Sequence, residues 1–231
     1  MCYHTATLDE VNLRAFLTAY GYEVYPYQMY YHADGFNMPM LPVTTTEAPK
    51  KVQPGMWKLI PHWIKTMDEA IKYANTLNAK CEEIFEKASY KSYIGKYRAL
   101  LWVGGFFEAN HPTKNETIPY YIYNCNREPI SIGCVYNNWI NQDTGELITT
   151  FSIITTPANE LMAGIHNDKK RMPLIIQPAD RDKWLGKLTK EEINNMMKPL
   201  PDGILAAHKV SNLVFKKRVD TNVPEVLEIV L

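Results

Sequence analysis

The sequence lacks several features that would narrow its function at once. Its four cysteines include no CxxC pair, and no histidine lies at a metal-binding spacing from them. We therefore expect free thiols in a reducing compartment, with neither disulfides nor a zinc site. No apolar run is long enough to cross a membrane, and the stretch from Leu8 to Tyr20 carries Asp9, Glu10 and Arg14, which excludes a signal-peptide core. These absences predict a cytoplasmic protein with no membrane partner.

An excess of charge of one sign is also absent. Lys and Arg total 25, as do Asp and Glu, so the formal net charge is zero. The total does not indicate a strongly basic nucleic-acid-binding protein, and any DNA contact must depend on local clusters of charge. Two short cationic runs exist, Lys169-Lys170-Arg171 and Lys216-Lys217-Arg218, but each alone is more typical of a solvated surface. The neutral balance is compatible with a monomer, which we expect.

Caps and composition indicate several helices and strands. Capping boxes that begin at Thr7, Thr66 and Thr189, and the proline that follows Thr156, each predict the start of a helix. The helix from Thr66 should run to about Leu77. Segments rich in β-branched and aromatic residues predict strands. These segments are 97–103, 120–125, 132–140, 147–155, 173–176 and 204–210.

The arrangement of these elements predicts the fold class. Asp143-Thr144-Gly145 is typical of a hairpin turn between two strands, and a further helix is expected over 178–185. The strands cluster without regular helical crossovers, which favours the α+β class. Residues 37–54, rich in Pro and Thr, are interpreted as a surface excursion. No repeat or linker divides residues 1–231, so we expect a single domain with a curved, largely antiparallel, barrel-like β-sheet core flanked by short helices.

Cys2 follows the initiator Met1 directly. Because cysteine is small, Met1 suits the aminopeptidase that trims initiator methionine, and the mature chain would then begin with cysteine. Its α-amine, with a reference pKa of roughly 7.7–8.0, and its thiol, of roughly 8.5, lie on adjacent carbons. Together they can capture an aldehyde as an imine that closes to a thiazolidine. A chain that retains Met1 has a blocked amine, and most early cysteines are simply small buried residues.

Three further side chains could carry chemistry, and each has a structural alternative. Glu108 follows the apolar run Gly104–Phe107, where desolvation would raise its pKa and suit it to proton transfer; otherwise it is a solvated carboxylate just past a strand end. His166 follows a predicted helix and could shuttle protons, or it is structural. Asn78 lies where the helix from Thr66 should end. It could cap that helix or orient a ligand through its amide.

Trp57 and Trp63 flank Pro61. Aromatic rings can stack on bases or wedge a distorted strand. Packing in a core is the commoner role of tryptophan, and the spacing alone does not choose between the two roles.

Taken together, these fragments resemble the SOS-response-associated peptidase (SRAP) family from Met1-Cys2 to about Val210-Ser211-Asn212. The most specific block leads from 153–159 through Ile165-His166-Asn167 to Arg171-Met172-Pro173. The other similar blocks are 57–63 to the family's WGLIPSW, 78–82 to its NAR-x-E and 105–108 to its GFYE. Each is weak alone, but their shared order behind an N-terminal cysteine is specific.

The resemblance implies a DNA-repair protein of the SOS response to DNA damage. Its partner would be single-stranded DNA that contains an abasic site, and it would capture the open-chain sugar aldehyde as a covalent thiazolidine crosslink. Autoproteolytic or peptidase activity and a lyase activity at abasic sites are also implied. No cofactor and no metal are implied.

The resemblance also assigns roles by motif position. Cys2 is the nucleophile through its amine and thiol, and Asn78 holds the mature N-terminus or the sugar. Glu108 shuttles protons at the sugar ring oxygen and the amine, while His166 supports ring opening and reversal of the crosslink. The expected DNA contacts are Lys80, Lys91, Arg171, Trp57 and Trp63.

Some positions depart from the family pattern. The family usually begins MCGR, whereas this chain begins Met1-Cys2-Tyr3-His4. The arginine of the NAR block is Lys80, which keeps the charge but loses bidentate phosphate geometry, and Ala109 stands where a tryptophan is expected. We therefore expect the chemistry to be kept and the DNA affinity to differ.

Two alternative functions remain open from the sequence. The first is a cysteine-dependent peptidase or amidohydrolase that uses Cys2, His166 and Glu108 as a triad-like set. The second is a non-catalytic DNA-binding module.

Overall fold

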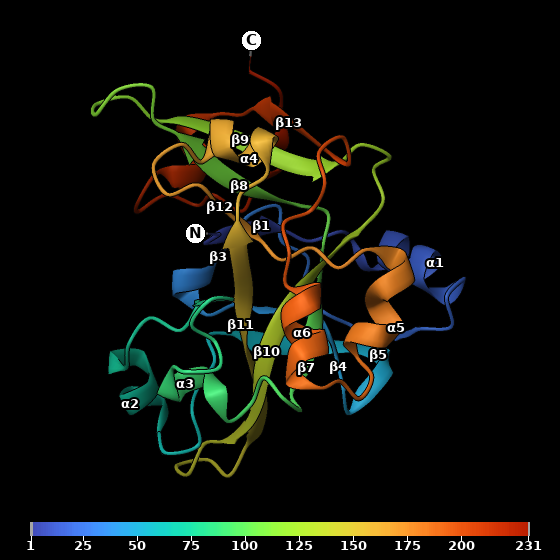
Figure 1. The fold of residues 1–231 in the computed structure, drawn as a ribbon. Coiled ribbons are helices and arrows are strands. Elements are labelled where there is room, and N and C mark those ends of the chain that lie inside the picture. Colours follow the sequence, from blue (N-terminus) through green and yellow to red (C-terminus); the bar gives the residue numbers. More distant parts are fainter. Residues whose placement is uncertain (1, 231) are drawn as a thin grey trace.

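The centre of the computed structural model, which describes residues 2–230, is a closed barrel of five strands (Figure 1). Neighbours pair antiparallel in the order β11-β10-β7-β4-β5, and a parallel pairing of β5 with β11 closes the ring. The strands are β4 (Met40–Thr45), β5 (Ala48–Trp57), β7 (Arg98–Val103), β10 (Ile130–Ile140) and β11 (Leu147–Pro157). The expected α+β fold with a barrel-like, largely antiparallel core is confirmed.

A second, antiparallel sheet occupies the upper part of Figure 1 and contains the N-terminal strand. Its order is β13 (Leu205–Lys209), β9 (Ile118–Asn124), β8 (Gly105–Asn110), β1 (His4–Ala6) and β3 (Ala33–Asp34). The chain passes from β7 of the barrel into β8 of this sheet through Gly104 alone. A β-carbon at Gly105 would lie 2.4 Å from the carbonyl oxygen of Ile122, so the close approach of β8 to β9 requires glycine.

Three short strands extend the barrel sheet. β2 (Glu23–Val24) pairs with β5. β6 (Asn78–Lys80) and β12 (Arg171–Pro173) both pair with the last residues of β11, in parallel and antiparallel fashion. β6 and β12 therefore flank the end of β11, one on each side of it.

The α-helices of residues 2–230 are short, and none of them is long and apolar enough to cross a bilayer. They are α1 (Glu10–Thr18), α2 (Met67–Lys72), α3 (Ala88–Lys91), α4 (Glu160–Ile165), α5 (Arg181–Trp184) and α6 (Lys190–Met196). Short 3-10 turns accompany them: η1 (Gly35–Asn37), η2 (Pro178–Asp180), η3 (Asn212–Phe215) and η4 (Pro224–Leu227). The predicted capping box at Thr189 is confirmed, with Glu192 as its second member.

The start of α1 and the end of α2 differ from those expected. α1 is capped by Asp9 instead of Thr7, because the hydroxyl of Thr7 accepts a hydrogen bond from the backbone N–H of Tyr30 at 2.7 Å. α2 is capped by Thr66 as predicted, but it ends at Lys72 and does not reach Leu77.

The interpretation of residues 37–54 as a surface excursion is wrong. This segment forms β4 and most of β5, and Pro42 pairs opposite Pro54 across them. Proline lacks a backbone donor, so two facing prolines fit a pair of positions that exchange no hydrogen bond. Thr156 and Pro157 likewise continue β11, and α4 begins only after the Asn159 cap.

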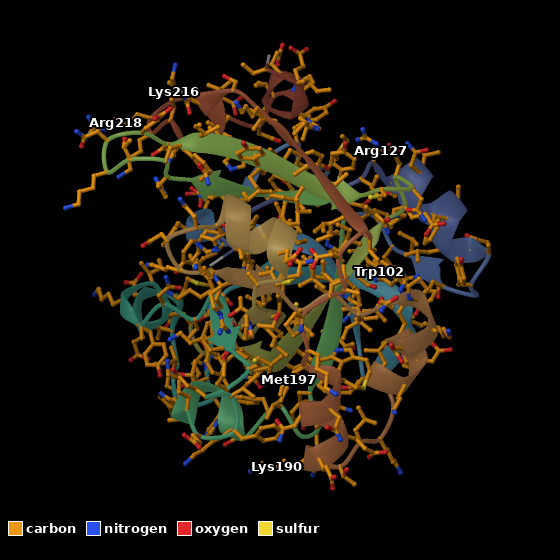
Figure 2. The ribbon with its side chains drawn as sticks, turned by 45° about the horizontal axis from the view of Figure 1, so that its top comes forward. Trp102, Arg127, Lys190, Met197, Lys216 and Arg218 are labelled. Carbon is orange, nitrogen blue, oxygen red and sulfur yellow. The ribbon has the colours of Figure 1, made fainter. Side chains whose placement is uncertain are left out.

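Side chains of β7 alternate between two buried layers. Leu101 belongs to the apolar cluster that contains Trp57 and Cys2, whereas Leu100 and Trp102 belong to a second cluster with the helices. Figure 2 labels Trp102 within this ribbon. Because both faces of β7 are covered, its residues from Ala99 to Val103 form a continuous apolar run and do not alternate with polar residues.

Candidate functional site

Cys2 lies just before β1, and its side chain is fully buried. Its thiol makes one long contact, 3.9 Å, with the carbonyl oxygen of His4. Burial raises the pKa of the Cys2 thiol well above its usual value, and the charge of Glu108 raises it further. The thiol is therefore protonated at neutral pH.

Asn78 holds the backbone of Cys2. Its Nδ2 donates to the carbonyl oxygen of Cys2 at 2.8 Å. The backbone carbonyl oxygen of Asn78 accepts a hydrogen bond from the Tyr90 hydroxyl at 3.1 Å. The residue pairs opposite Ile153 in the β6–β11 ladder. Asn78 begins a strand six residues after α2 has ended, so the helix-cap alternative is wrong, and the amide instead orients the N-terminal segment.

Glu108 lies within β8, which pairs with β1 so that Phe107 is opposite His4. The residue is only 6% exposed, and burial raises the pKa of the Glu108 carboxyl to about 7. The alternative of a solvated carboxylate beyond a strand end is therefore wrong. A carboxyl group with this pKa can both donate and accept a proton near neutral pH.

His166 caps the C-terminal end of α4 and completes the cluster. Its Nδ1 lies 2.9 Å from the carbonyl oxygen of Arg171 and 3.9 Å from Oε2 of Glu108. Because a carbonyl oxygen only accepts, Nδ1 carries the hydrogen, and Nε2 is the basic nitrogen of the neutral ring. Burial lowers the pKa of His166, which favours this neutral form at pH 7.

Four elements thus bring four chemically distinct groups to one place. The N-terminal segment supplies Cys2, β6 supplies Asn78, β8 supplies Glu108 and the end of α4 supplies His166. An amide fixes the cysteine backbone while a carboxyl of raised pKa and a neutral imidazole lie within 3.9 Å of each other. Such a set can bind an electrophilic carbonyl, give it a proton and take one away.

Comparison with known proteins identifies the family of this chain. A family model described as SOS response associated peptidase (SRAP) matches residues 1–217. The chain belongs to the SRAP family. "Abasic site processing protein YoqW" of Bacillus subtilis is 30% identical over 74% of this chain and 74% of its own length. "Abasic site processing protein HMCES" of Pongo abelii is 28% identical over 76% of this chain, which spans 56% of that protein.

Solved structures share the fold of this chain. A crystal structure of a protein from Bacteroides thetaiotaomicron is 32% identical, covers 100% of both chains and has a TM-score of 0.87. A second, from Bordetella bronchiseptica, is 19% identical over 91% of this chain with a TM-score of 0.78. The latter likeness shows a shared fold.

The cations at SRAP motif positions differ in how they are engaged. The guanidinium of Arg171 binds Glu82 through two hydrogen bonds of 2.5 and 3.0 Å and donates to the carbonyl oxygen of Thr155 at 2.6 Å. A DNA phosphate would therefore compete with Glu82 for Arg171. Lys80 is exposed, with its Nζ 3.4 Å from Glu83, and Lys91 is exposed at the end of α3. Their DNA contacts stay predictions.

The two tryptophans of the SRAP-like block have different environments. Trp57 is completely buried, and its indole N–H donates to the carbonyl oxygen of Leu77 at 2.9 Å. A base cannot reach this ring in the folded barrel, so the prediction of Trp57 as a DNA contact is wrong. Trp63 is 38% exposed and makes edge contacts with His62 and Tyr73. It stays a predicted contact.

One cluster near Cys2 was missed by the sequence interpretation. His4 Nδ1 lies 2.9 Å from His32 Nε2, and His32 Nδ1 lies 2.7 Å from the hydroxyl of Thr221. These residues are far apart in the chain, so no local pattern predicts their contact. Within residues 2–230, this cluster included, no group of three or more His, Cys, Asp or Glu side chains has the geometry of a metal site.

Proposed function

We propose that this chain handles abasic sites in single-stranded DNA by forming a covalent thiazolidine with the sugar aldehyde through Cys2. The observation that carries the proposal is the 2.8 Å hydrogen bond from Asn78 to the Cys2 backbone, beside a buried Glu108 and His166. The names of the SRAP relatives, abasic site processing proteins, support the substrate. The proposal includes one cytoplasmic domain that acts as a monomer, because a single chain supplies all four side chains.

The proposed reaction needs no external oxidant or reductant. After removal of Met1, the α-amine of Cys2 attacks C1′ of the open-chain sugar, and loss of water gives an imine. The thiol sulfur then bonds to C1′, and its proton passes to the imine nitrogen. The sum is aldehyde plus aminothiol to thiazolidine plus water. A protonated thiol is adequate for this order of steps because the amine attacks first.

Glu108 and His166 supply the proton movements in this proposal. Protonated Glu108 donates to the sugar ring oxygen during ring opening and regains a proton from the C1′ hydroxyl, which becomes the aldehyde. It then donates to the hydroxyl that departs when the imine forms. Its pKa of about 7 keeps a useful fraction protonated at neutral pH. His166, held by the Arg171 carbonyl oxygen, accepts a proton at Nε2 and stabilises the carboxyl group beside it.

A gel assay with abasic single-stranded DNA tests the proposal. The processed protein should give an adduct that survives heat and denaturant, and Cys2→Ala should give none. Cys125→Ala is the matched control, since Cys125 is an exposed thiol without a free α-amine, and it should crosslink normally. An undiminished adduct in Cys2→Ala, or none with processed native protein, contradicts the proposal.

The same Cys2→Ala variant distinguishes imine chemistry from thiazolidine chemistry. Its N-terminal amine still forms an imine, which borohydride should trap, and strand cleavage of the lyase type should increase because no thiol captures the imine. The peptidase alternative is weaker. A cysteine peptidase needs a thiolate, whereas burial raises the pKa of the Cys2 thiol. Peptide turnover without DNA would support that alternative.

A further inference from the structure

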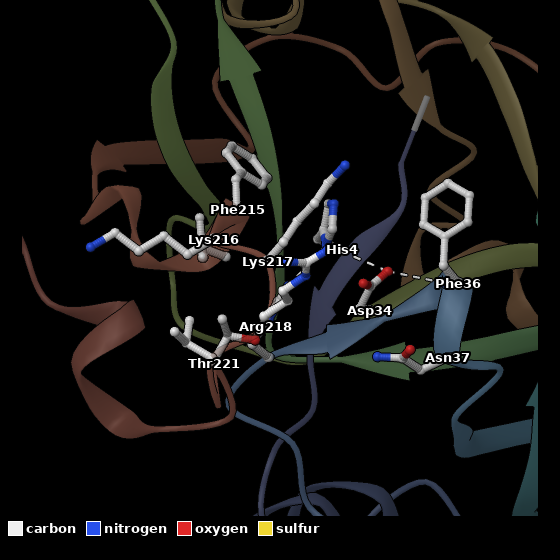
Figure 3. A pocket seen from close by; sticks show the side chains of 12 residues that line it. His4, Asp34, Phe36, Asn37, Phe215, Lys216, Lys217, Arg218 and Thr221 are labelled. Carbon is white, nitrogen blue, oxygen red and sulfur yellow. Dashed lines mark hydrogen bonds and ion pairs between the residues drawn. The ribbon is translucent and has the colours of Figure 1, made fainter.

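A pocket of about 550 Å³ lies beside His4, two residues after Cys2 (Figure 3). Its walls come from β1, from Phe36 in η1 and from the C-terminal residues 214–219. Asn78, Glu108 and His166 do not line it, so it is a surface separate from the reactive cluster. We call it the His4 pocket.

The His4 pocket carries a local excess of positive charge. Lys216, Lys217 and Arg218 line it, all are exposed, and within residues 2–230 none is paired with a carboxylate. Figure 3 shows Lys217 and Arg218 extending beside His4 while Lys216 points away, and Figure 2 shows Lys216 and Arg218 at the same edge of the molecule. The acidic group in the wall is Asp34. In a chain of zero net charge, this surface attracts anions.

An exposed aromatic ring lies in the same pocket. Phe36 is 59% exposed, and its ring centroid lies 5.0 Å from that of Tyr3, the residue that follows Cys2. Cations beside exposed aromatic rings are the combination by which single-stranded DNA is bound without sequence preference. The rings of Tyr3 and Phe36 therefore lie between the reactive cluster at Cys2 and the cations of the His4 pocket.

The cationic segment is anchored on both sides. Before it, Val214 is buried in an apolar cluster. Asn222 Oδ1 accepts from the backbone N–H groups of Tyr31 and His32 at 2.8 and 3.3 Å. Arg218 adopts a left-handed backbone with φ of 63°, a conformation that non-glycine residues keep only where surrounding contacts impose it. The pocket is thus preformed and needs no ordering of a free tail on binding.

We propose that the His4 pocket binds the nucleotide adjacent to the abasic site, with Lys217 and Arg218 on its phosphate and Phe36 against its base. This inference rests on the proposed function for the identity of the strand. The strand would run from Cys2 past Tyr3 and Phe36 toward the cations. Because phosphates carry no sequence information, the contact is independent of sequence.

The test compares two triple variants that lose the same charge. One is Lys216→Gln, Lys217→Gln and Arg218→Gln; the control is Lys183→Gln, Lys187→Gln and Lys198→Gln, exposed cations outside the pocket. The ligand is a short single strand with a tetrahydrofuran residue, which has no aldehyde, in two sequence contexts. Fluorescence anisotropy measures Kd from low to high salt.

The pocket variant should bind on the order of tenfold more weakly at low salt, equally in both sequences, with a log–log salt slope reduced by about 1.4, since each of the two cation contacts to a single strand contributes about 0.7. The control variant should change less than twofold, and Phe36→Leu should weaken binding several-fold without altering the salt slope. Equal losses in both triple variants, or an unchanged salt slope, would overturn the proposal.

Crosslinking separates this inference from the proposed function. At saturating abasic DNA, the pocket variant should reach the wild-type yield of adduct, because Cys2 and its partners are intact. If wild type forms no adduct but the pocket variant still loses affinity, the proposed chemistry fails while the pocket stands. If wild type forms a normal adduct but the pocket variant shows no selective loss of affinity, the proposed chemistry stands and the pocket inference fails.

Discussion

Burial decides what each side chain around Cys2 can do. The buried carboxyl of Glu108 has its pKa raised to about 7, while burial lowers the pKa of His166 and raises that of the Cys2 thiol. All three shifts favour the uncharged form. At neutral pH the thiol and the imidazole are therefore uncharged and the Glu108 carboxyl is about half protonated, which suits the proposed attack by a neutral amine on a neutral aldehyde.

The raised pKa of Glu108 predicts a pH-dependent stability. The carboxyl keeps its proton to about pH 7 in the folded state and loses it near 4.5 when unfolded. The folded state thus binds more protons between these values, so stability falls as pH rises from 4.5 to 7, by roughly 3 kcal/mol from this group. Glu108→Gln should remove that part of the slope.

Urea unfolding of both proteins from pH 4 to 8 measures the difference. Other titrating groups, including His166, contribute nearly equally to both curves and cancel in the difference. The wild-type unfolding free energy minus that of Glu108→Gln therefore isolates the contribution of the Glu108 carboxyl. Parallel curves over the whole range would show that Glu108 has an ordinary pKa. The same variant should also form crosslink more slowly, since an amide cannot donate the proton.

Motif order predicted the residues of the cluster but not their environments. Cys2, Asn78, Glu108 and His166 were all selected from the sequence, and the structure brings them together. The local sequence could not decide between burial and DNA contact for Trp57, because the barrel that covers it is closed by β11, which lies about ninety residues later. A local pattern contains no such information.

At the scale of elements, β11 organises the site. One strand pairs with β10, β5, β6 and β12 along its length. β6 carries Asn78, and β12 carries the Arg171 carbonyl that holds His166. The β1–β8 pair then brings Cys2 and Glu108 to this end of the barrel.

The approach of β8 to β9 predicts a sensitive glycine. In Gly105→Ala the new methyl group would lie 2.4 Å from the Ile122 carbonyl oxygen and 2.5 Å from the ring of Tyr121. Backbone must move, so the variant should lose about 2 to 3 kcal/mol of unfolding free energy. Because β8 also carries Glu108, the crosslinking rate should fall even where the protein is folded.

Urea denaturation and adduct formation at low urea measure these two effects. Gly95→Ala is the matched control, because a β-carbon there has no atom within 4 Å, and it should change stability by less than 1 kcal/mol. Equal stability of the two variants would mean that β8 and β9 can separate without cost.

Strands with regular β-branched composition were predictable, whereas the proline-containing β4–β5 hairpin was not. Prolines ordinarily mark loops, and only the facing position of Pro42 and Pro54 allows them within the sheet. That position depends on the register of two strands. Composition alone does not fix a register.

At the scale of the molecule, the site requires both sheets. Glu108 belongs to the sheet that contains β1 and β8, and Cys2 directly precedes this β1, while Asn78 belongs to the barrel sheet through β6. The chain crosses between the sheets at Gly104 without a linker. If residues 1–231 form one domain, as expected, the two sheets should unfold together.

Two probes can follow the sheets separately during unfolding. All five tryptophans lie outside the sheet that contains β1, so tryptophan fluorescence reports on the barrel side of the molecule, whereas the proposed crosslinking uses side chains from both sheets. We expect the urea midpoints of fluorescence and of crosslinking competence to coincide, as in a single cooperative unit. Loss of crosslinking at clearly lower urea would mean that the N-terminal sheet detaches first and that residues 1–231 form two units of different stability.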